Sequence, residues 1–329
     1  MKQIISFLET AKIARKQVHH NITVFPLLAP NGSVPDYLTL EQALDQNLIR
    51  ITELDTEGSV PELKLKNLGK KKVLIIEGEE LVGAKQNRIV NSSFFIAGKI
   101  EVVIPVSCVE QGRWRYKSGR FESGKKMMHA SLRKEHQEEV RFSLKRGDGY
   151  TSNQGRIWNN IADKSARMKV KAPTGAMADV FDSYEDELSA FLEKFHLIEW
   201  QVGAVFAING QVLGAEGFGC HDTFKRFFDK LVKSYALDAL DNLKRQQDGP
   251  VPPDKARRFI KSATKSKGEG YPSIGLGTNI TFESRTVSGI ALVEEGRVLH
   301  LSAFKKEKKA NSPGVGFQRY SHRRTRRIY

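Results

Sequence analysis

Apolar side chains recur every three or four residues in several stretches of the chain, a spacing that puts them on one face of a helix. The sequence predicts about five main helices: one within residues 1–17, three between 128 and 195, and a long one from Asp222, its predicted N-cap, to about 240. Shorter helical patterns lie at 40–47 and 255–263.

Strand patterns gather toward the two ends of the chain. An apolar run, a polar turn with glycine and a second apolar run occur three times, at 73–83, 204–214 and 289–301. Each copy predicts a β-hairpin, most strongly at Asn209-Gly210, because a type I′ turn needs positive φ at both central residues. Three ordinary hairpins are favoured over a true internal repeat. Residues 116–126 are rich in glycine, serine and lysine and are expected to form a loop.

Strands at both ends with helices between them favour an α+β fold over an alternating α/β fold. We expect a largely antiparallel sheet built from several β-hairpins and packed with the helices. Residues 1–304 are expected to form a single α+β domain, and two lobes with a boundary near 120–200 are the alternative. Residues 305–329 are expected to be a basic, flexible C-terminal tail.

The composition is that of a folded chain without a membrane segment. Apolar residues make up 40% and charged residues 28%, close to the average of globular proteins. No apolar run approaches the roughly 20 residues that cross a bilayer, and residues 1–17 lack the pattern of a signal peptide. Only two cysteines occur. We therefore expect a cytoplasmic protein without a membrane partner, and the oligomeric state stays open.

The net charge of +15 is concentrated at the C-terminal end, where residues 305–329 hold nine Lys or Arg and one Glu. Phe317, Tyr320 and Tyr329 lie among these cations, so this tail could contact nucleic acid through phosphate charge and base stacking. A solvated end without a partner is the favoured interpretation of such a charge run.

The densest group of polar residues follows the apolar run 73–76. A strand that leaves the core can hold such groups rigidly at its end. Glu79 and Glu80 are candidate catalytic carboxylates, and because neighbours on a strand point to opposite faces, at most one should enter a given pocket. The candidate ligand-binding residues of this segment are Lys85, Gln86, Asn87, Arg88 and Asn91. A charged hairpin tip with surface ion pairs is the alternative, and composition alone favours it.

A second polar group follows the predicted strand 100–106. It consists of Cys108, Glu110, Arg113 and Trp114. If the two strand ends are neighbours, Arg88 and Arg113 would hold phosphate and Trp114 would stack on a base. Glu110 is then the third candidate for acid or base catalysis. Cys108, Arg113 and Trp114 are candidate ligand-binding residues, and because Cys108 has no histidine near it in the sequence, a small buried thiol is favoured over a nucleophile.

Gln154 and Trp158 belong to a third motif at the start of a predicted helix, where exposed N–H groups could bind an anion. Asn153 as a simple N-cap explains this motif equally well. The histidines are scattered and no C-x-x-C or H-x-x-x-H spacing occurs, so we predict no metal site from them. No cofactor is required by the sequence, although Mg²⁺ held by glutamates is compatible with it.

These segments resemble the ARG and rhodanese-phosphatase-superfamily-associated protein domain, a mostly bacterial family of unknown function. The likeness runs from about Ile22 to Phe304 and includes the later hairpins with the segment 234–240 between them. It rests most on Glu77-Gly-Glu-Glu-Leu-Val-Gly-Ala-Lys-Gln-Asn-Arg88, Pro105-Val-Ser-Cys-Val-Glu-Gln-Gly-Arg-Trp114 and Gln154-Gly-Arg-Ile-Trp158. The resemblance implies a link, by gene neighbourhood, with ADP-ribosylglycohydrolases and phosphatases, and so with NAD-derived nucleotides. It implies no catalytic residues.

Three hypotheses follow. The leading one is a pocket for an ADP-ribose-like or other small phosphorylated nucleotide, with a glycosidic or phosphate bond hydrolysed by water that Glu80 or Glu79 activates. The second is a non-catalytic nucleotide sensor or binding module whose tail contacts nucleic acid. The third is a structural or partner-binding protein, favoured if the two motif segments are buried and paired with each other without a cleft.

Overall fold

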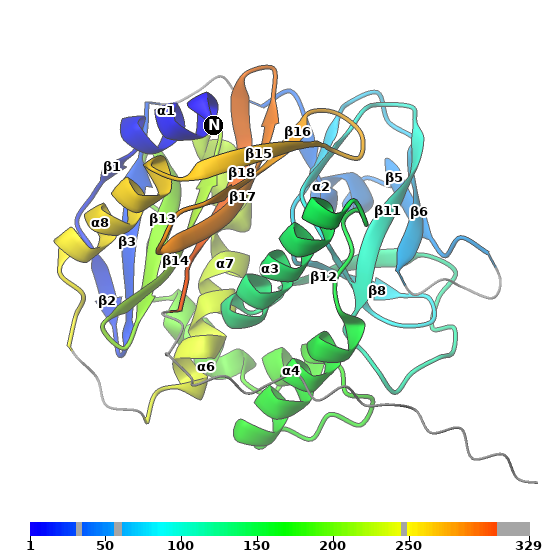
Figure 1. The fold of residues 1–329 in the computed structure, drawn as a ribbon. Coiled ribbons are helices and arrows are strands. Elements are labelled where there is room, and N and C mark those ends of the chain that lie inside the picture. The colour runs from blue at the N-terminus through cyan, green and yellow to red at the C-terminus, as the bar shows by residue number, and fades with distance from the viewer. Residues whose placement is uncertain (31–34, 56–60, 245–248, 308–329) are drawn as a thin grey trace, which may run out of the picture.

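The computed structural model describes residues 1–30, 35–55, 61–244 and 249–307 (Figure 1). Strands supplied by both ends of the chain form one large sheet, and the region between residues 38 and 127 forms two smaller sheets. Helices lie between and outside the sheets. The predicted α+β class with a largely antiparallel sheet is confirmed.

The large sheet has nine strands, and all of their pairings are antiparallel. Its order is β1-β3-β13-β14-β18-β17-β16-β15, with β2 also paired to β3. The strands are β1 (Lys12–Ile13), β2 (Gln17–His19), β3 (Ile22–Leu28), β13 (Gln201–Ile208), β14 (Gln211–Phe218), β15 (Lys267–Pro272), β16 (Thr278–Glu283), β17 (Val287–Glu294) and β18 (Arg297–Lys305).

The six-stranded sheet has the order β12-β8-β9-β11-β6-β5, and the three-stranded sheet has the order β10-β7-β4, in which β4 and β7 are parallel. Their strands are β4 (Leu38–Thr39), β5 (Ile49–Thr52), β6 (Glu62–Asn67), β7 (Val73–Ile75), β8 (Glu79–Gly83), β9 (Arg88–Val90), β10 (Phe94–Ile96), β11 (Glu101–Cys108) and β12 (Phe121–Met127). The predicted loop at 116–126 is therefore wrong for its second half, because β12 pairs with β8.

Eight helices lie in the described part of the chain. They are α1 (Lys2–Thr10), α2 (Leu40–Asp45), α3 (Ala130–Arg146), α4 (Gln154–Arg167), α5 (Met177–Asp182), α6 (Glu185–Leu192), α7 (His221–Asp241) and α8 (Pro253–Thr264). The last pattern before residue 195 is two short helices instead of one. Cys220, and not Asp222, is the N-cap of α7. Asp222 lies in the first turn, where its negative charge still complements the helix dipole.

Two of the three predicted hairpins are confirmed. β13 pairs with β14, and β17 with β18, and the Asn209-Gly210 turn has positive φ at both residues, as a type I′ turn requires. The hairpin predicted at 73–83 is wrong, because β7 pairs with β10 and β4 while β8 pairs with β9 and β12. The segment between β7 and β8 leads from one sheet to the next, and within it the Glu77 carboxylate is held by Arg133 of α3.

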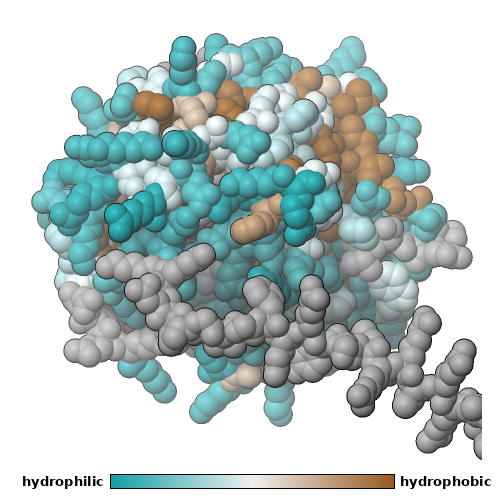
Figure 2. All heavy atoms as spheres, in the orientation of Figure 1, coloured by the Kyte–Doolittle hydropathy of each residue, from teal (hydrophilic) through white to brown (hydrophobic). Residues whose placement is uncertain are grey.

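Apolar residues pack on both faces of the large sheet. Helix α7 covers one face together with α3 to α6, and α1 and α8 cover the other. A third core lies among the smaller sheets. The view in Figure 2 is mostly hydrophilic, with hydrophobic residues gathered on the side where Figure 1 places β6 and β11. No helix in the described ranges is long and apolar enough to span a membrane. One domain or two lobes stays a prediction.

A buried group of charged residues joins α3 to the large sheet, and we name it the central cluster. Arg133 donates from Nη1 to Glu216 Oε1 at 2.8 Å and from Nη2 to Glu77 Oε1 at 3.0 Å. Burial would lower the pKa of Arg133, but Glu216 and Glu77 raise it overall. The other members of the cluster are Gln137, Tyr235 and Ser302.

Candidate functional site

The two motif segments lie side by side in the six-stranded sheet. β9 is antiparallel to β11, with Arg88 opposite Cys108 and Ile89 opposite Ser107. Residues that are directly opposite share a face of the sheet. The condition set in the sequence analysis, that the two polar segments are neighbours, is therefore met by the backbone. The contacts of the side chains determine whether the segments form a binding site.

Glu110 and Arg113 are held by each other and by their surroundings. The Glu110 carboxylate lies 2.7 Å from Arg113 Nη2 and accepts hydrogen bonds from the Asn87 backbone N–H and the Thr174 hydroxyl, both at 3.0 Å. Arg113 also donates to Asn87 Oδ1 and to the Ala84 carbonyl. Burial opposes ionisation, but Arg113 and the other donors lower the pKa of Glu110. The pair is a saturated clasp between the two segments.

Arg88 is different, because its guanidinium is fully buried but largely unpartnered. Nη1 donates to Gln86 Oε1 at 2.9 Å, and Nη2 lies 3.9 Å from Glu53 Oε1. Nε and Nη2 donate no hydrogen bond to any described residue. Burial lowers the pKa of Arg88, and Cys108 and Glu53 offset only part of that effect. Buried donors without partners are rare and mark a place for a ligand or ordered water.

Glu53 is a residue that the sequence analysis missed. It follows β5, its side chain is buried, and its Oε1 accepts from the Lys85 backbone N–H at 3.4 Å. Oε2 has no hydrogen-bond partner within the described residues. The available signal was its place directly after the residues that form β5, since Glu110 was selected because it follows a strand.

Cys108 and the third motif lie against Arg88. The Cys108 sulfur is 3.1 Å from Gln86 Oε1, and Gln154 bonds both the N–H and the carbonyl of Cys108, at 2.8 and 2.7 Å. Trp158 is close to the sulfur, but its indole N–H forms no regular hydrogen bond with a described residue. Burial raises the pKa of the Cys108 thiol, which disfavours the thiolate.

Two exposed aromatic rings cover this group. Trp114 is 48% exposed and Tyr116 is 52% exposed. Lys85 Nζ lies 5.2 Å from the centroid of the Trp114 ring and 5.3 Å from that of Tyr116. Arg88 Cζ lies 5.9 Å from the Trp114 centroid. Trp114 is therefore the outer neighbour of the buried guanidinium. We name Glu53, Gln86, Arg88, Cys108, Trp114 and Trp158 the hairpin cluster.

Glu80 lies on the opposite face of the β8 and β9 pair from Arg88, since Glu80 is opposite Ile89 and Leu81 is opposite Arg88. Both Glu80 carboxylate oxygens are buried without a hydrogen-bond partner among the described residues. Burial raises the pKa of Glu80 to about 7, with a smaller opposing effect from Lys126. A Cβ on Gly124 would lie 2.6 Å from Glu80 Oε2, so the neighbouring strand closes over this carboxylate.

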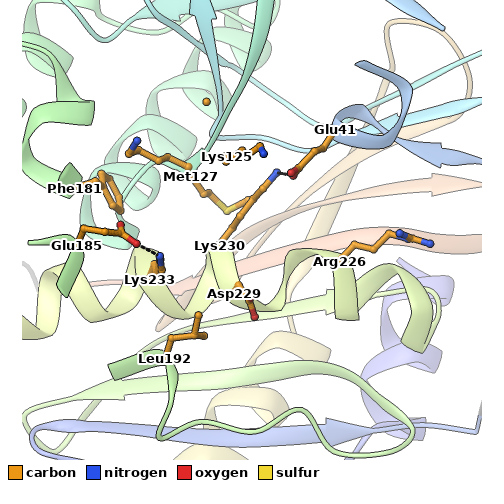
Figure 3. A pocket seen from close by; sticks show the side chains of 12 residues that line it. Glu41, Lys125, Met127, Phe181, Glu185, Leu192, Arg226, Asp229, Lys230 and Lys233 are labelled. Carbon is orange, nitrogen blue, oxygen red and sulfur yellow. Dashed lines mark hydrogen bonds and ion pairs between the residues drawn. The ribbon is translucent and has the colours of Figure 1, made fainter. Parts of the chain in front are cut away.

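Glu79 is paired with Lys230 of α7, whose Nζ lies 3.3 Å from Glu79 Oε1 and 2.6 Å from Glu41 Oε2. Burial raises the pKa of Glu79 although Lys230 opposes it. Lys230 also lines a cavity of about 400 Å³ between α2, β12, α5, α6 and α7 (Figure 3). Lys233 in this cavity meets Glu185, and Lys126 meets Asp182. These three lysines are already paired with carboxylates, and Lys125 and Arg226 also line the cavity.

Asn91 is used inside the protein. Its amide donates to the Tyr150 carbonyl at 2.9 Å, and its Oδ1 accepts from the Ser107 hydroxyl at 2.7 Å and lies 3.1 Å from His136 Nε2. Asn91 shares the strand face of Ile89 and Ser107, away from Arg88. The structure thus groups Gln86, Arg88, Cys108, Trp114, Gln154 and Trp158, and it separates Asn91, Glu79 and Glu80 from them.

The predicted tail and metal ligation add little to this site. Lys305 ends β18 and donates to Gln211, and Lys306 pairs with Glu283. Residues 308–329, which carry most of the predicted tail, lie outside the described residues. Within the described ranges, no three His, Cys, Asp or Glu side chains are grouped as metal ligands. Mg²⁺ binding rests on the sequence alone.

The fold and this site define an α+β protein with two separate buried charge clusters. The sequence profile of the ARG and Rhodanese-Phosphatase-superfamily-associated Protein domain matches residues 10–304. The chain belongs to this family, and the resemblance seen in the motifs is confirmed. Comparisons with curated proteins and with solved structures find no significant match.

Proposed function

We propose that the chain binds a small phosphorylated nucleotide of the ADP-ribose type at the hairpin cluster. The observation that carries the proposal is the buried Arg88 guanidinium, whose Nε and Nη2 have no hydrogen-bond acceptor among the described residues, although Nη2 lies 3.9 Å from Glu53 Oε1. These two N–H groups are the edge with which arginine binds phosphate in a bidentate way. A bound phosphate would satisfy both donors and restore the charge balance that Glu53 supplies only from 3.9 Å.

Trp114 and Lys85 support the nucleotide part of the proposal. The Trp114 ring is half exposed and lies over Arg88, so it can move aside to admit a phosphate and stack on a base. Lys85 adds a cation beside both exposed rings. The family's name associates it with phosphatases, and a phosphorylated ligand is consistent with that association.

Hydrolysis of a glycosidic or phosphate bond is the second part of the proposal, and it needs a carboxylate on the Arg88 face. Glu79 is paired with Lys230 and Glu110 with Arg113, while Glu80 faces the other side. Glu53 is the carboxylate that lies beside Arg88 with an unpartnered oxygen. We therefore assign to Glu53 the activation of water that the sequence assigned to Glu80 or Glu79, and the acid or base catalysis for which Glu110 was the third candidate.

A non-catalytic sensor is the second candidate function. The saturation of Glu79 and Glu110 favours it, because two of the three carboxylates proposed from sequence are occupied by structural cations. The same saturation fits a purely structural role for the clasp. The Arg88 Nε and Nη2 donors, which have no acceptor among the described residues, favour ligand binding over this structural role.

Calorimetry with ADP-ribose tests the binding proposal. The wild-type protein should bind, and Arg88→Met should bind about 10 to 100 times more weakly, because charge-assisted hydrogen bonds contribute ~1.5–3 kcal/mol. Arg120→Met is the matched control, since Arg120 is an exposed arginine near the same strand end. Equal heats for wild type and Arg88→Met would remove the proposal.

Turnover separates the two functions. Chromatography of ADP-ribose incubated with the protein should show product for wild type and none for Glu53→Gln, while both proteins bind the nucleotide. Binding without product in the wild type selects the sensor. A Glu80→Gln variant that loses product would return the catalytic role to Glu80.

A further inference from the structure

Helices α1 and α8 lie next to each other on the outer face of the large sheet, at a distance from the hairpin cluster (Figure 1). Their apolar faces cover the sheet through residues such as Leu8 and Phe259. Between the helices, and against β1, runs a groove of about 730 Å³.

The floor of this groove is aliphatic. It is formed by Ile5, Leu8, Ala11, Ile13 and Ile260. Ile5 and Leu8 are three residues apart on α1, so they present one continuous stripe along the groove. No aromatic residue is found among the described residues that line the groove, and its apolar surface lies between two helices.

The rim of the groove is basic. Lys12, Arg257, Lys261 and Lys265 line it, against Glu9 as the one acidic residue of the lining. Lys12, Lys261 and Lys265 form no ion pair with another described residue, and Arg257 pairs only with the exposed Asp254. These cations therefore keep charge available for an acidic partner.

The groove continues past β1. A second hollow of about 550 Å³ shares Ile13 and Arg257 with the first and adds Arg15 and the exposed Val18. The pattern of apolar floor and basic rim is thus extended along the same face. Helix α8 has 12 residues and is about 18 Å long, which matches about three turns of a helix lying alongside it.

We propose that this groove binds an amphipathic helix of a protein partner, with an apolar stripe that enters the floor and acidic residues that meet the rim. Helix-in-groove recognition uses apolar anchors at i, i+3 or i+4, and i+7 on the entering helix. The rim cations contribute orientation and association rate, while the aliphatic floor contributes most of the affinity.

Charge and shape decide between this occupant and three others. A second copy placed symmetrically would set the same cations against each other, which is unfavourable. Nucleic acid would meet the rim but would leave the aliphatic floor unused, since bases stack on aromatic rings. A membrane surface would be reached by protruding apolar side chains, but the apolar residues of the first groove are buried or partly buried beside exposed cations, and Val18 is the exposed apolar residue of the second hollow.

Fluorescence anisotropy of a labelled peptide of about 15 residues, with leucines at helical spacing and glutamates elsewhere, tests the proposal. The full-length protein should bind this peptide, and a scrambled peptide of equal composition should bind at least tenfold more weakly. Lys261→Glu with Lys265→Glu should weaken binding of the ordered peptide at least tenfold, and added salt should weaken it in the wild type.

Lys171→Glu with Lys225→Glu is the matched control, with the same change of charge outside the groove. The control should bind the ordered peptide like the wild type. Equal binding of ordered and scrambled peptides, or equal loss in both double variants, would overturn the proposal. Loss of binding to phosphatidylserine vesicles or to a single-stranded oligonucleotide on Lys261→Glu with Lys265→Glu, without peptide binding by the wild type, would assign the groove to that partner instead.

Discussion

Two arginines, Arg88 and Arg133, are both fully buried and lie in adjacent parts of the fold, yet their surroundings differ. Arg133 in the central cluster holds carboxylates with both terminal nitrogens, at 2.8 and 3.0 Å. Arg88 in the hairpin cluster holds one amide oxygen, and its nearest carboxylate is 3.9 Å away. The pKa of Arg133 is raised by its partners, whereas burial lowers that of Arg88.

The difference shows how a structural charge is told from a candidate binding group. A buried charge whose terminal nitrogens are both bonded to carboxylates joins elements of the fold, because its partners replace the water it lost; this is the case for Arg133, of which only Nε lacks a partner among the described residues. A buried charge with unused donors has lost the same hydration, but protein partners do not replace it at those donors, so the fold alone does not explain it. Four experiments test this distinction.

The largest expected effect is on the central cluster. Arg133→Met leaves Glu77 and Glu216 buried without their cation, and breaking such a pair costs about 3–5 kcal/mol of unfolding free energy. Urea denaturation measures this loss. Arg156→Met is the control, because Arg156 is exposed and its pair with Glu139 should contribute less than about 1 kcal/mol. A loss below 1 kcal/mol for Arg133→Met would show that its buried ion pairs stabilise the fold no more than an exposed pair does.

The second effect depends on pH and concerns Glu80. Its folded-state pKa of about 7 lies above the unfolded value of 4.5, so the folded protein binds the proton more tightly. Its contribution to stability is complete below pH 4.5 and is lost as the pH rises through 7. Glu80→Gln should therefore be about 3 kcal/mol more stable than wild type at pH 8 and nearly equal at pH 4.5. Urea denaturation at the two pH values checks this, and a constant difference would contradict it.

The third effect is the stability cost of removing Arg88. Arg88→Met loses one hydrogen bond to Gln86 but also removes two unpartnered buried donors, so we expect a cost of about 1 kcal/mol or less. The same urea titration used for Arg133→Met provides the comparison. A cost equal to that of Arg133→Met would show that Arg88 is as fully engaged as Arg133.

The smallest effect on stability is expected for Trp114. Its ring is half exposed, so Trp114→Ala should change the unfolding free energy by less than about 0.5 kcal/mol. The same variant should weaken ADP-ribose binding several-fold in calorimetry, because a stacked ring contributes ~1–3 kcal/mol. A large stability loss without any change in binding would make Trp114 a structural cover instead of a ligand contact.

Sequence reasoning located the motif segments but assigned some of their roles differently from the contacts now seen. Arg88 and Arg113 were interpreted alike, as phosphate clamps. The structure gives Arg113 a carboxylate and several carbonyls, and it leaves Arg88 with unused donors. Both are arginines at a strand end, so only their neighbours from elsewhere in the chain distinguish them. Glu53, 35 positions before Arg88, is such a neighbour.

Local sequence determined what depends on local physics. The helical spacing fixed the regions of α1, α3, α4, α7 and α8, and Asn209-Gly210 fixed the turn between β13 and β14, because backbone conformation is set within a few residues. Tertiary structure alone decided that β7 and β8 join different sheets and that residues 121–127 form a strand. It also decided which buried charges are paired. Strand partners and ion pairs are chosen across long separations in the chain, where the pattern of one segment carries no information about its neighbour.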